Sequence, residues 1–193
     1  MFFTNIKSVK EPENSILFPI YKSAYFIDSY SVKLPTTKNN NNNNNNNKND
    51  INPELLANFF FNNPPKWFTV LLNIRDKLVS AFGIKSTDYI RNNANKLGIK
   101  TIGFFPIISS SKNEIILGED DKHLDFRASL LIQPIKNSNN NNKNNEEKEL
   151  VATTVVHCHG LLGKLYLNII KPFHILIIKH NLSKVPELLS KID

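Results

Sequence analysis

The chain has 193 residues and a formal net charge of +7, and its 21 lysines and 3 arginines are spread along the whole sequence. Nucleic-acid binding usually needs clustered basic residues, often arginines, so we expect no nucleic-acid partner. The single cysteine, Cys158, excludes an internal disulfide framework and a multi-cysteine zinc module, and it fits a reducing compartment.

The first predicted element is a strand. Residues 1–20 are interpreted as an N-terminal extension to a single domain that spans residues 21–191. Tyr25 to Leu34 alternate with period two and are rich in aromatic and β-branched residues, which predicts a strand that ends at Pro35. A disordered insertion rich in asparagine is predicted next, over residues 36–50, because it lacks the apolar side chains that offset the entropy of ordering.

Two helices are predicted after this insertion. Asn52 precedes Pro53 and Glu54, which indicates a helix N-cap followed by proline at the first helical position. A second helix is predicted from Lys66 to Phe82, because large apolar residues recur there at steps of three and four before Gly83.

The pattern beyond Gly98 is typical of strands. Four β-rich segments, 101–109, 114–117, 124–134 and 150–157, are separated by turn residues, so we expect sequential antiparallel strands joined by hairpins. A second insertion rich in asparagine is predicted over residues 136–148. Residues 161–191 return to helical spacing. We expect Pro172 to kink or divide this helix and Pro186 to start a further short helix.

This order of elements predicts an α+β fold in which a curved antiparallel sheet wraps around a long C-terminal helix, because that arrangement buries both apolar surfaces. Without the two insertions the chain keeps about 165 residues, enough for one core that needs no disulfide or metal. Both insertions fall between elements, where extra residues cost little closure entropy.

The sequence shows no targeting or membrane segment by the usual criteria. Met1 to Lys10 contain no apolar run of signal-peptide length. The most apolar stretch, 161–178, is interrupted by Lys164, Lys171 and Pro172, so it lacks the roughly 20 apolar residues of a bilayer span. We therefore expect a soluble, cytoplasmic protein.

The densest polar segment is GEDDKHLDFR, residues 118–127. On a strand, His123, Asp125 and Arg127 share one face. In one interpretation these groups form ion pairs on a solvated face or anchor a neighbouring loop. In the other, the face lines an internal cavity, where Asp125 holds Arg127 or His123 to bind a polar substituent of a ligand.

A second candidate group lies on the C-terminal helix. Tyr166, Ile170 and His174 recur every four residues and so share one stripe. Such a stripe is either core, with His174 hydrogen-bonded to a backbone carbonyl, or the wall of an apolar pocket in which Tyr166 and His174 are the polar groups.

The sequence gives little support for a metal site, a cofactor site or a catalytic nucleophile. His157 and His159 would share a strand face, but no cysteine pair, HExxH motif or third ligand accompanies them, so we expect no metal. The phosphate-binding and nucleophile motifs GxGxxG, GxxxxGK[ST] and GxSxG are missing from the sequence, so no cofactor is predicted.

Several motifs carry a family resemblance, namely Trp67 with LLNIRDKL (71–78), GF at Gly103, EIILGEDDKHLDFR (114–127), TVV (154–156) and LGKLYLNIIKPFH (162–174). Together they resemble the uncharacterised family called domain of unknown function 2867 (DUF2867), which is similar to the SRPBCC superfamily of START-like and pollen-allergen-like ligand binders. The resemblance implies a helix-grip fold with a cavity between the curved sheet and the C-terminal helix. Relatives use that cavity for lipids, polyketides and plant hormones, sometimes with cyclase or hydrolase activity. The motif positions that carry over are Arg75, Asp76, Glu114, Asp121, His123, Asp125, Arg127, Tyr166 and His174.

We therefore predict a protein that binds a small, largely apolar ligand between sheet and C-terminal helix. One alternative is an enzyme of the same fold, in which His123 or His174 acts as general acid or base beside Asp125. Another is an accessory protein to an NAD(P)-dependent, dehydrogenase-like partner, because some bacterial members resemble a tail fused to such a domain. A protein-interaction module would instead expose a large apolar patch. The predicted ligand-binding residues are Trp67, His123, Asp125, Arg127, Tyr166 and His174.

Overall fold

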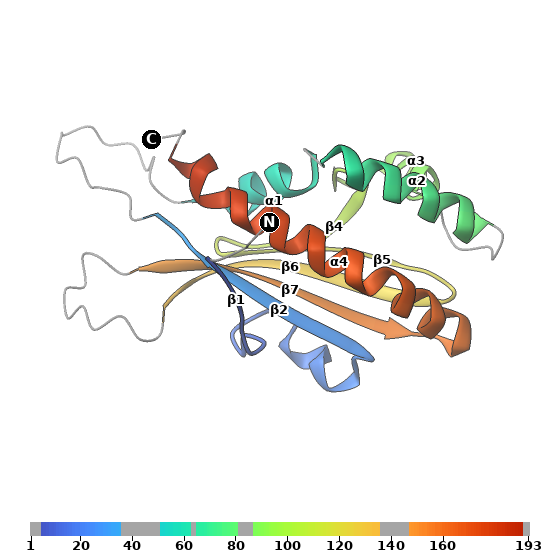
Figure 1. Ribbon diagram of the computed structural model, residues 1–193, viewed down its shortest axis with the longest axis horizontal. Helices are drawn as coiled ribbons and strands as arrows, with labels where there is room; N and C mark the ends of the chain where they lie inside the picture. The colour runs from blue at the N-terminus through green and yellow to red at the C-terminus, as the bar shows by residue number, and fades with distance from the viewer. Residues whose placement is uncertain (1–4, 36–50, 63–64, 81–86, 136–146, 191–193) are drawn as a thin grey trace.

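The computed structural model describes residues 5–35, 51–62, 65–80, 87–135 and 147–190. These residues form a seven-stranded antiparallel sheet with helices α1 to α4 on one face and a short 3-10 helix on the other (Figure 1). The strands lie in the order β1-β2-β7-β6-β5-β4-β3. The strands are β1 (Ile6–Ser8), β2 (Phe26–Lys33), β3 (Thr101–Ile102), β4 (Phe105–Ser110), β5 (Glu114–Asp120), β6 (Leu124–Pro134) and β7 (Lys148–Cys158), and the helices are η1 (Phe18–Ser23), α1 (Pro53–Asn62), α2 (Lys66–Ser80), α3 (Thr87–Lys96) and α4 (Gly160–Leu189).

The predicted α+β class, with an antiparallel sheet and a long C-terminal helix, is confirmed. The predicted N-cap of α1 is confirmed as well, because the backbone N–H of Glu54 donates to Asn52 Oδ1 at 2.8 Å. The β-rich segment predicted at 101–109 is divided into β3 and β4 by Gly103, whose φ of 64° suits glycine. The two predicted insertions lie almost wholly outside the described residues, although β7 begins at Lys148, the last residue of the second one.

Helix α3 was not predicted. Its sequence, TDYIRNNANK, is mostly polar, and within residues 88–96 only Ile90 and Ala94 bury their side chains. Two buried residues one turn apart are too short a pattern to stand out among asparagines, which are poor helix formers.

The predicted division of the C-terminal helix is wrong, because α4 continues through both Pro172 and Pro186. Pro172 cannot donate a backbone hydrogen bond to the carbonyl of Asn168. Both residues are exposed, so water can solvate the carbonyl that loses its partner. The helix therefore tolerates Pro172 without dividing, and Pro186 does not start a new helix.

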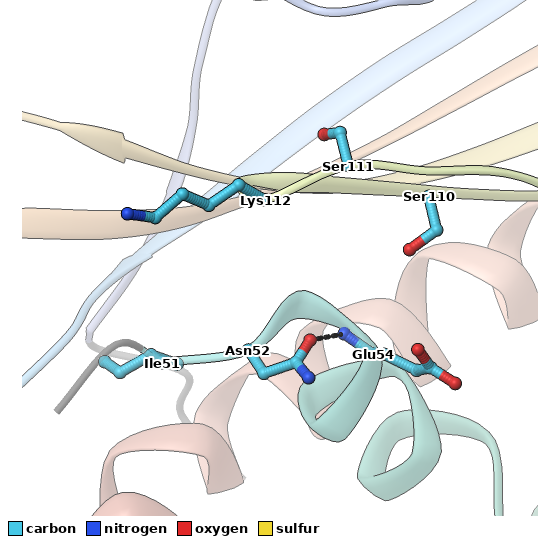
Figure 2. Close-up of a pocket in the computed structure, with 6 residues that line it drawn as sticks. All are labelled: Ile51, Asn52, Glu54, Ser110, Ser111 and Lys112. Atoms are coloured by element: carbon cyan, nitrogen blue, oxygen red, sulfur yellow. Dashed lines mark hydrogen bonds between the residues drawn. The ribbon is translucent and has the colours of Figure 1, made fainter. Parts of the chain in front are cut away.

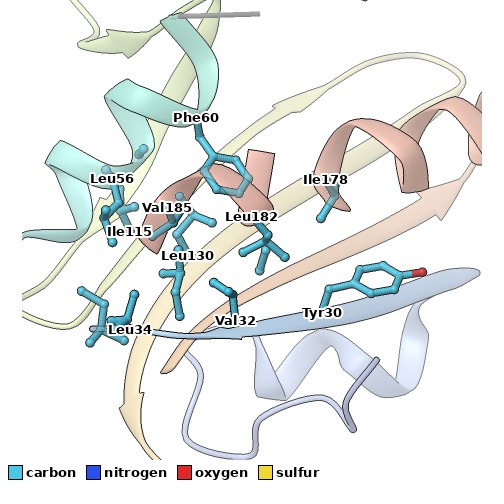
Figure 3. Packing of buried hydrophobic residues seen from close by; sticks show 14 of the residues in the cluster. Tyr30, Val32, Leu34, Leu56, Phe60, Ile115, Leu130, Ile178, Leu182 and Val185 are labelled. Carbon is cyan, nitrogen blue, oxygen red and sulfur yellow. The ribbon is translucent and has the colours of Figure 1, made fainter. Parts of the chain in front are cut away.

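The main core lies between the sheet and the helices (Figure 3). Helix α4 packs on β2 and β7, and α1 packs on β5 and β6. Leu182 of α4 is fully buried against Val32 of β2 and Leu150 of β7, and Phe60 of α1 completes the same cluster. Burial of this apolar area is the main term that holds α4 on the sheet.

The N-terminal segment, interpreted from sequence as an extension, is part of the folded unit. Strand β1 pairs with β2 at the edge of the sheet, and Leu17 is buried with Val155 and Ile116 on the face opposite α4. Glu114 of β5 fixes this segment, because its carboxyl group accepts hydrogen bonds from Ser15 Oγ at 2.5 Å and from the backbone N–H of Ile16 at 2.8 Å. The N-terminal residues therefore cover part of the second face of the sheet.

Candidate functional site

A transverse row of residues crosses the sheet beneath α4. Asp28 of β2 pairs with Thr154 of β7, Thr154 pairs with Ala128 of β6, and Ala128 pairs with Leu117 of β5. Paired residues point to the same face of a sheet, and alternation with Val32 and Leu130 places this row on the face that α4 covers. Neighbouring strands are about 4.8 Å apart, so the row runs about 10 Å from Asp28 to Ala128.

The side chains that pack above this row do not cover it completely. Ala128 is partly exposed although β6 is an interior strand of the sheet, and Phe126, two residues earlier on the same face, is partly exposed too. Leu117 and Leu130 beside them are almost fully buried. In a closed core a small residue on an interior strand is covered, so the cover over the sheet is incomplete at Ala128.

A polar pair closes one end of the row. His174 of α4 lies with Nε2 3.3 Å from Asp28 Oδ1, and its ring makes an edge-on contact with Phe26. The second carboxyl oxygen, Asp28 Oδ2, is buried and has no hydrogen-bond partner among the described residues. A buried carboxyl oxygen without a donor costs about 1–3 kcal/mol, more if charged, so a donor at this atom would stabilise the site.

A second buried polar atom lies farther along α4. His180 is buried, and its Nε2 has no hydrogen-bond partner among the described residues. Its ring packs edge-on against Trp67 of α2, with the ring centres 6.0 Å apart. Burial, and next the positive charge of Lys184, lower the pKa of His180 below its ordinary value of 6.5. Both causes favour the neutral imidazole of His180 over its charged form.

This shift predicts a pH dependence of stability. In the unfolded chain His180 takes up a proton near pH 6.5, whereas in the folded chain it stays neutral to lower pH. The free energy of unfolding should therefore fall as the pH drops from 6.5 toward the lower folded pKa. Urea unfolding of His180→Phe at several pH values should show a smaller decrease than the parent, and equal decreases would contradict the assignment.

The stripe of Tyr166, Ile170 and His174 faces the sheet beside this row. Tyr166 and Ile170 pack in an apolar cluster with Phe126 and Val156. His174 follows one turn later, at Asp28. The structure thus brings Tyr166 and His174 to the same layer. Trp67 contacts the same helix through its ring contact with His180.

Asp125 and Arg127 of the HLDFR motif lie on the other face of the sheet, whereas Leu124 and Phe126 face α4. Arg127 donates to Asp120 Oδ1 at 2.6 Å, and Asp125 Oδ2 lies 2.8 Å from His159 Nε2. Each contact joins one of these residues to a partner outside the trio of His123, Asp125 and Arg127. The enzymatic alternative needed Asp125 beside a catalytic histidine such as His174, but the carboxylate neighbour of His174 is Asp28.

His123 has a backbone role in the turn before β6. Its carbonyl accepts a hydrogen bond from the backbone N–H of His159 at 2.8 Å and lies against Gly163 of α4. His157 bonds Ser23 Oγ of η1 at 2.9 Å. No group of three residues suited to a metal occurs in the described part of the chain.

Asp28, Thr154, Ala128 and His180 were missed by the sequence analysis. Asp28 did carry a signal, because it interrupts the apolar face that Phe26, Tyr30 and Val32 form at period two. Ala128 and Thr154 gave none, since small residues are common in strands and only the register places them between Asp28 and Leu117.

A pocket of about 390 Å³ lies elsewhere, at the start of α1 beside the turn between β4 and β5 (Figure 2). Its lining is largely polar, and Asn52 is already engaged as the cap of α1. The pocket does not contact the Asp28 row. Its lining residues are Ile51, Asn52, Glu54, Ser110, Ser111 and Lys112.

Comparison with known families matches residues 20–181 to a family described as a protein of unknown function, DUF2867. No curated protein and no solved structure matches the chain. The matched region includes every strand from β2 onward and all of α4 up to Asn181, and therefore the whole Asp28 row with Trp67, Tyr166, His174 and His180. Because the match covers most of its length, the chain belongs to the DUF2867 family.

Proposed function

We propose that the chain binds a small, largely apolar molecule with one hydrogen-bond donor group, held between the sheet and α4 in the manner of helix-grip proteins. The observation that carries the proposal is Asp28 Oδ2, a buried acceptor without a partner among the described residues, in an otherwise apolar layer. Pockets for small molecules are mainly apolar and contain a few convergent polar groups of this kind.

The apolar part of the ligand would lie over Ala128 and Phe126, where the layer is partly exposed. Tyr166 and Ile170 of α4 supply one wall at this place. The donor, a hydroxyl or an amine, would reach Asp28 beside His174. The family resemblance supports the same location, because helix-grip proteins hold their ligands between the curved sheet and the C-terminal helix.

Filling the space over Ala128 tests the location. Ala128→Phe should lower the affinity for a long-chain alkanol by at least about tenfold, because the new ring occupies the volume that the alkyl chain would take. The readout is the fluorescence of Trp67, the one tryptophan of the chain. The control is Asp125→Ala on the opposite face, which should leave the affinity unchanged; loss in both variants, or in neither, would contradict the location.

The role of Asp28 is tested with the same titration. Asp28→Asn keeps the size of the side chain but removes the charged acceptor, so the alkanol should bind about tenfold more weakly. The matching methyl ether has no donor and should bind parent and variant equally. An equal loss for alkanol and ether would show that Asp28 supports the fold rather than the ligand.

A further inference from the structure

The outward face of α4 is an apolar ridge, formed by Leu161, Leu165, Ile169, Phe173 and Leu176. These side chains are between 42% and 84% exposed and recur at steps of four and three, so they form one stripe. At a rise of 1.5 Å per residue, the ridge is about 22 Å long. Contiguous exposed apolar surface of this kind marks an interaction site.

Helix α4 is also strongly apolar in composition. In the described part of the chain, α4 is long and apolar enough to cross a membrane by length and composition, whereas the sequence analysis predicted no such segment. Only 17% of its most apolar window of 18 residues is buried, so the chain itself does not cover this surface.

Positive charge lies along one flank of the ridge, in a lysine flank formed by Lys164, Lys171 and Lys179. Their ammonium groups lie over aromatic rings of β2 and of the residue before it, at 5.1, 4.6 and 4.9 Å from the ring centres of Tyr25, Phe26 and Tyr30. These contacts hold the lysine stems beside α4. No acidic residue occurs between Gly160 and Pro186, so nothing on this part of the helix offsets the charge.

We infer that the ridge and the lysine flank bind the surface of an anionic lipid bilayer, with α4 lying in the plane of the interface. Apolar side chains would enter the boundary between headgroups and acyl chains, and the lysines would meet anionic headgroups. The same positive flank disfavours a second copy of the chain as the occupant, because two ridges in contact would bring like charges together.

The helix lies on the bilayer and does not cross it. Its inner face packs Leu167, Ile178 and Leu182 against the sheet, and crossing would expose these residues and the strands beneath them. This inference does not depend on the proposed ligand, because Ala128 and Asp28 lie on the sheet and the ridge faces away from it.

Vesicle flotation of the full chain tests the inference. The protein should float with vesicles of phosphatidylcholine mixed with phosphatidylserine, and much less with phosphatidylcholine alone or at high salt. The double variant L165S/I169S should partition at least about tenfold more weakly. The double variant L97S/I108S, equally exposed away from α4, should behave like the parent.

The contribution of the lysine flank is tested separately in the same vesicle experiment. K164Q/K171Q should lose about fivefold in partitioning per lysine with anionic vesicles and little with neutral ones. The inference would be overturned if the protein did not float, or if L165S/I169S floated as well as the parent. It would also be overturned if detergent, but not high pH, removed the protein from the vesicles. If Ala128→Phe floats normally but binds no alkanol, the two proposals are separated.

Discussion

Glu114→Ala is expected to lower the free energy of unfolding by about 3–5 kcal/mol, because it removes one carboxyl group that serves three donors, two of them buried. Ser15 Oγ and Ser129 Oγ each donate to Oε1 at 2.5 Å, and the backbone N–H of Ile16 donates to Oε2 at 2.8 Å. The variant leaves all three without this acceptor. Urea unfolding followed by Trp67 fluorescence measures the loss.

The matched control is Glu114→Gln, which keeps the size of the side chain and one acceptor oxygen. It should cost less than half as much as the alanine variant, since the hydroxyl groups can still donate to the amide oxygen. Hydrogen exchange at Ile16 should become fast in Glu114→Ala, because this bond ties the N-terminal segment to β5. Slow exchange at Ile16 with a loss below about 1 kcal/mol would refute the role of Glu114.

Gly163→Ala is the second substitution with a large expected effect. It should lower the free energy of unfolding by about 3 kcal/mol. A Cβ at this position would clash with the carbonyl oxygen of His123, so either α4 or the turn before β6 must move. The carbonyl cannot turn away cheaply, because it accepts the backbone hydrogen bond from His159. Displacement of the first turns of α4 would also shift Tyr166 and weaken alkanol binding.

Gly98→Ala is the control for backbone strain alone. Gly98 has a φ of +65°, and a Cβ added there would meet nothing within 4 Å. Gly98→Ala should therefore lower the free energy of unfolding by only about 1 kcal/mol. Equal losses for the two glycine variants would show that close packing of α4 on the turn at His123 is not what requires Gly163.

Most of the fold could be predicted because it depends on local patterns. Period-two alternation marked β2, β-rich segments separated by turn residues marked the strands from 101 onward, and the cap at Asn52 marked the start of α1. The failures have physical causes. Helix α3 carries too few apolar residues to show a stripe, and Pro172 lies at an exposed turn where water replaces the lost hydrogen bond.

The candidate site was harder to predict because it depends on register. The sequence placed Asp125 and Arg127 on one face, but only strand pairing shows that this face lies opposite α4. The stripe of Tyr166 and His174 was visible from helical spacing, whereas its partner Asp28 lies 146 residues away from His174 in the chain. A contact at that separation leaves no local signal beyond one carboxylate on an apolar strand face.

Native mass spectrometry of the purified chain tests the central claim most directly. The parent should carry a small organic molecule that denaturation releases, and Ala128→Phe, purified in the same way, should lack it. If the parent has the mass of the bare chain and Trp67 emission does not respond to the alkanol, the space over Ala128 is not a ligand site.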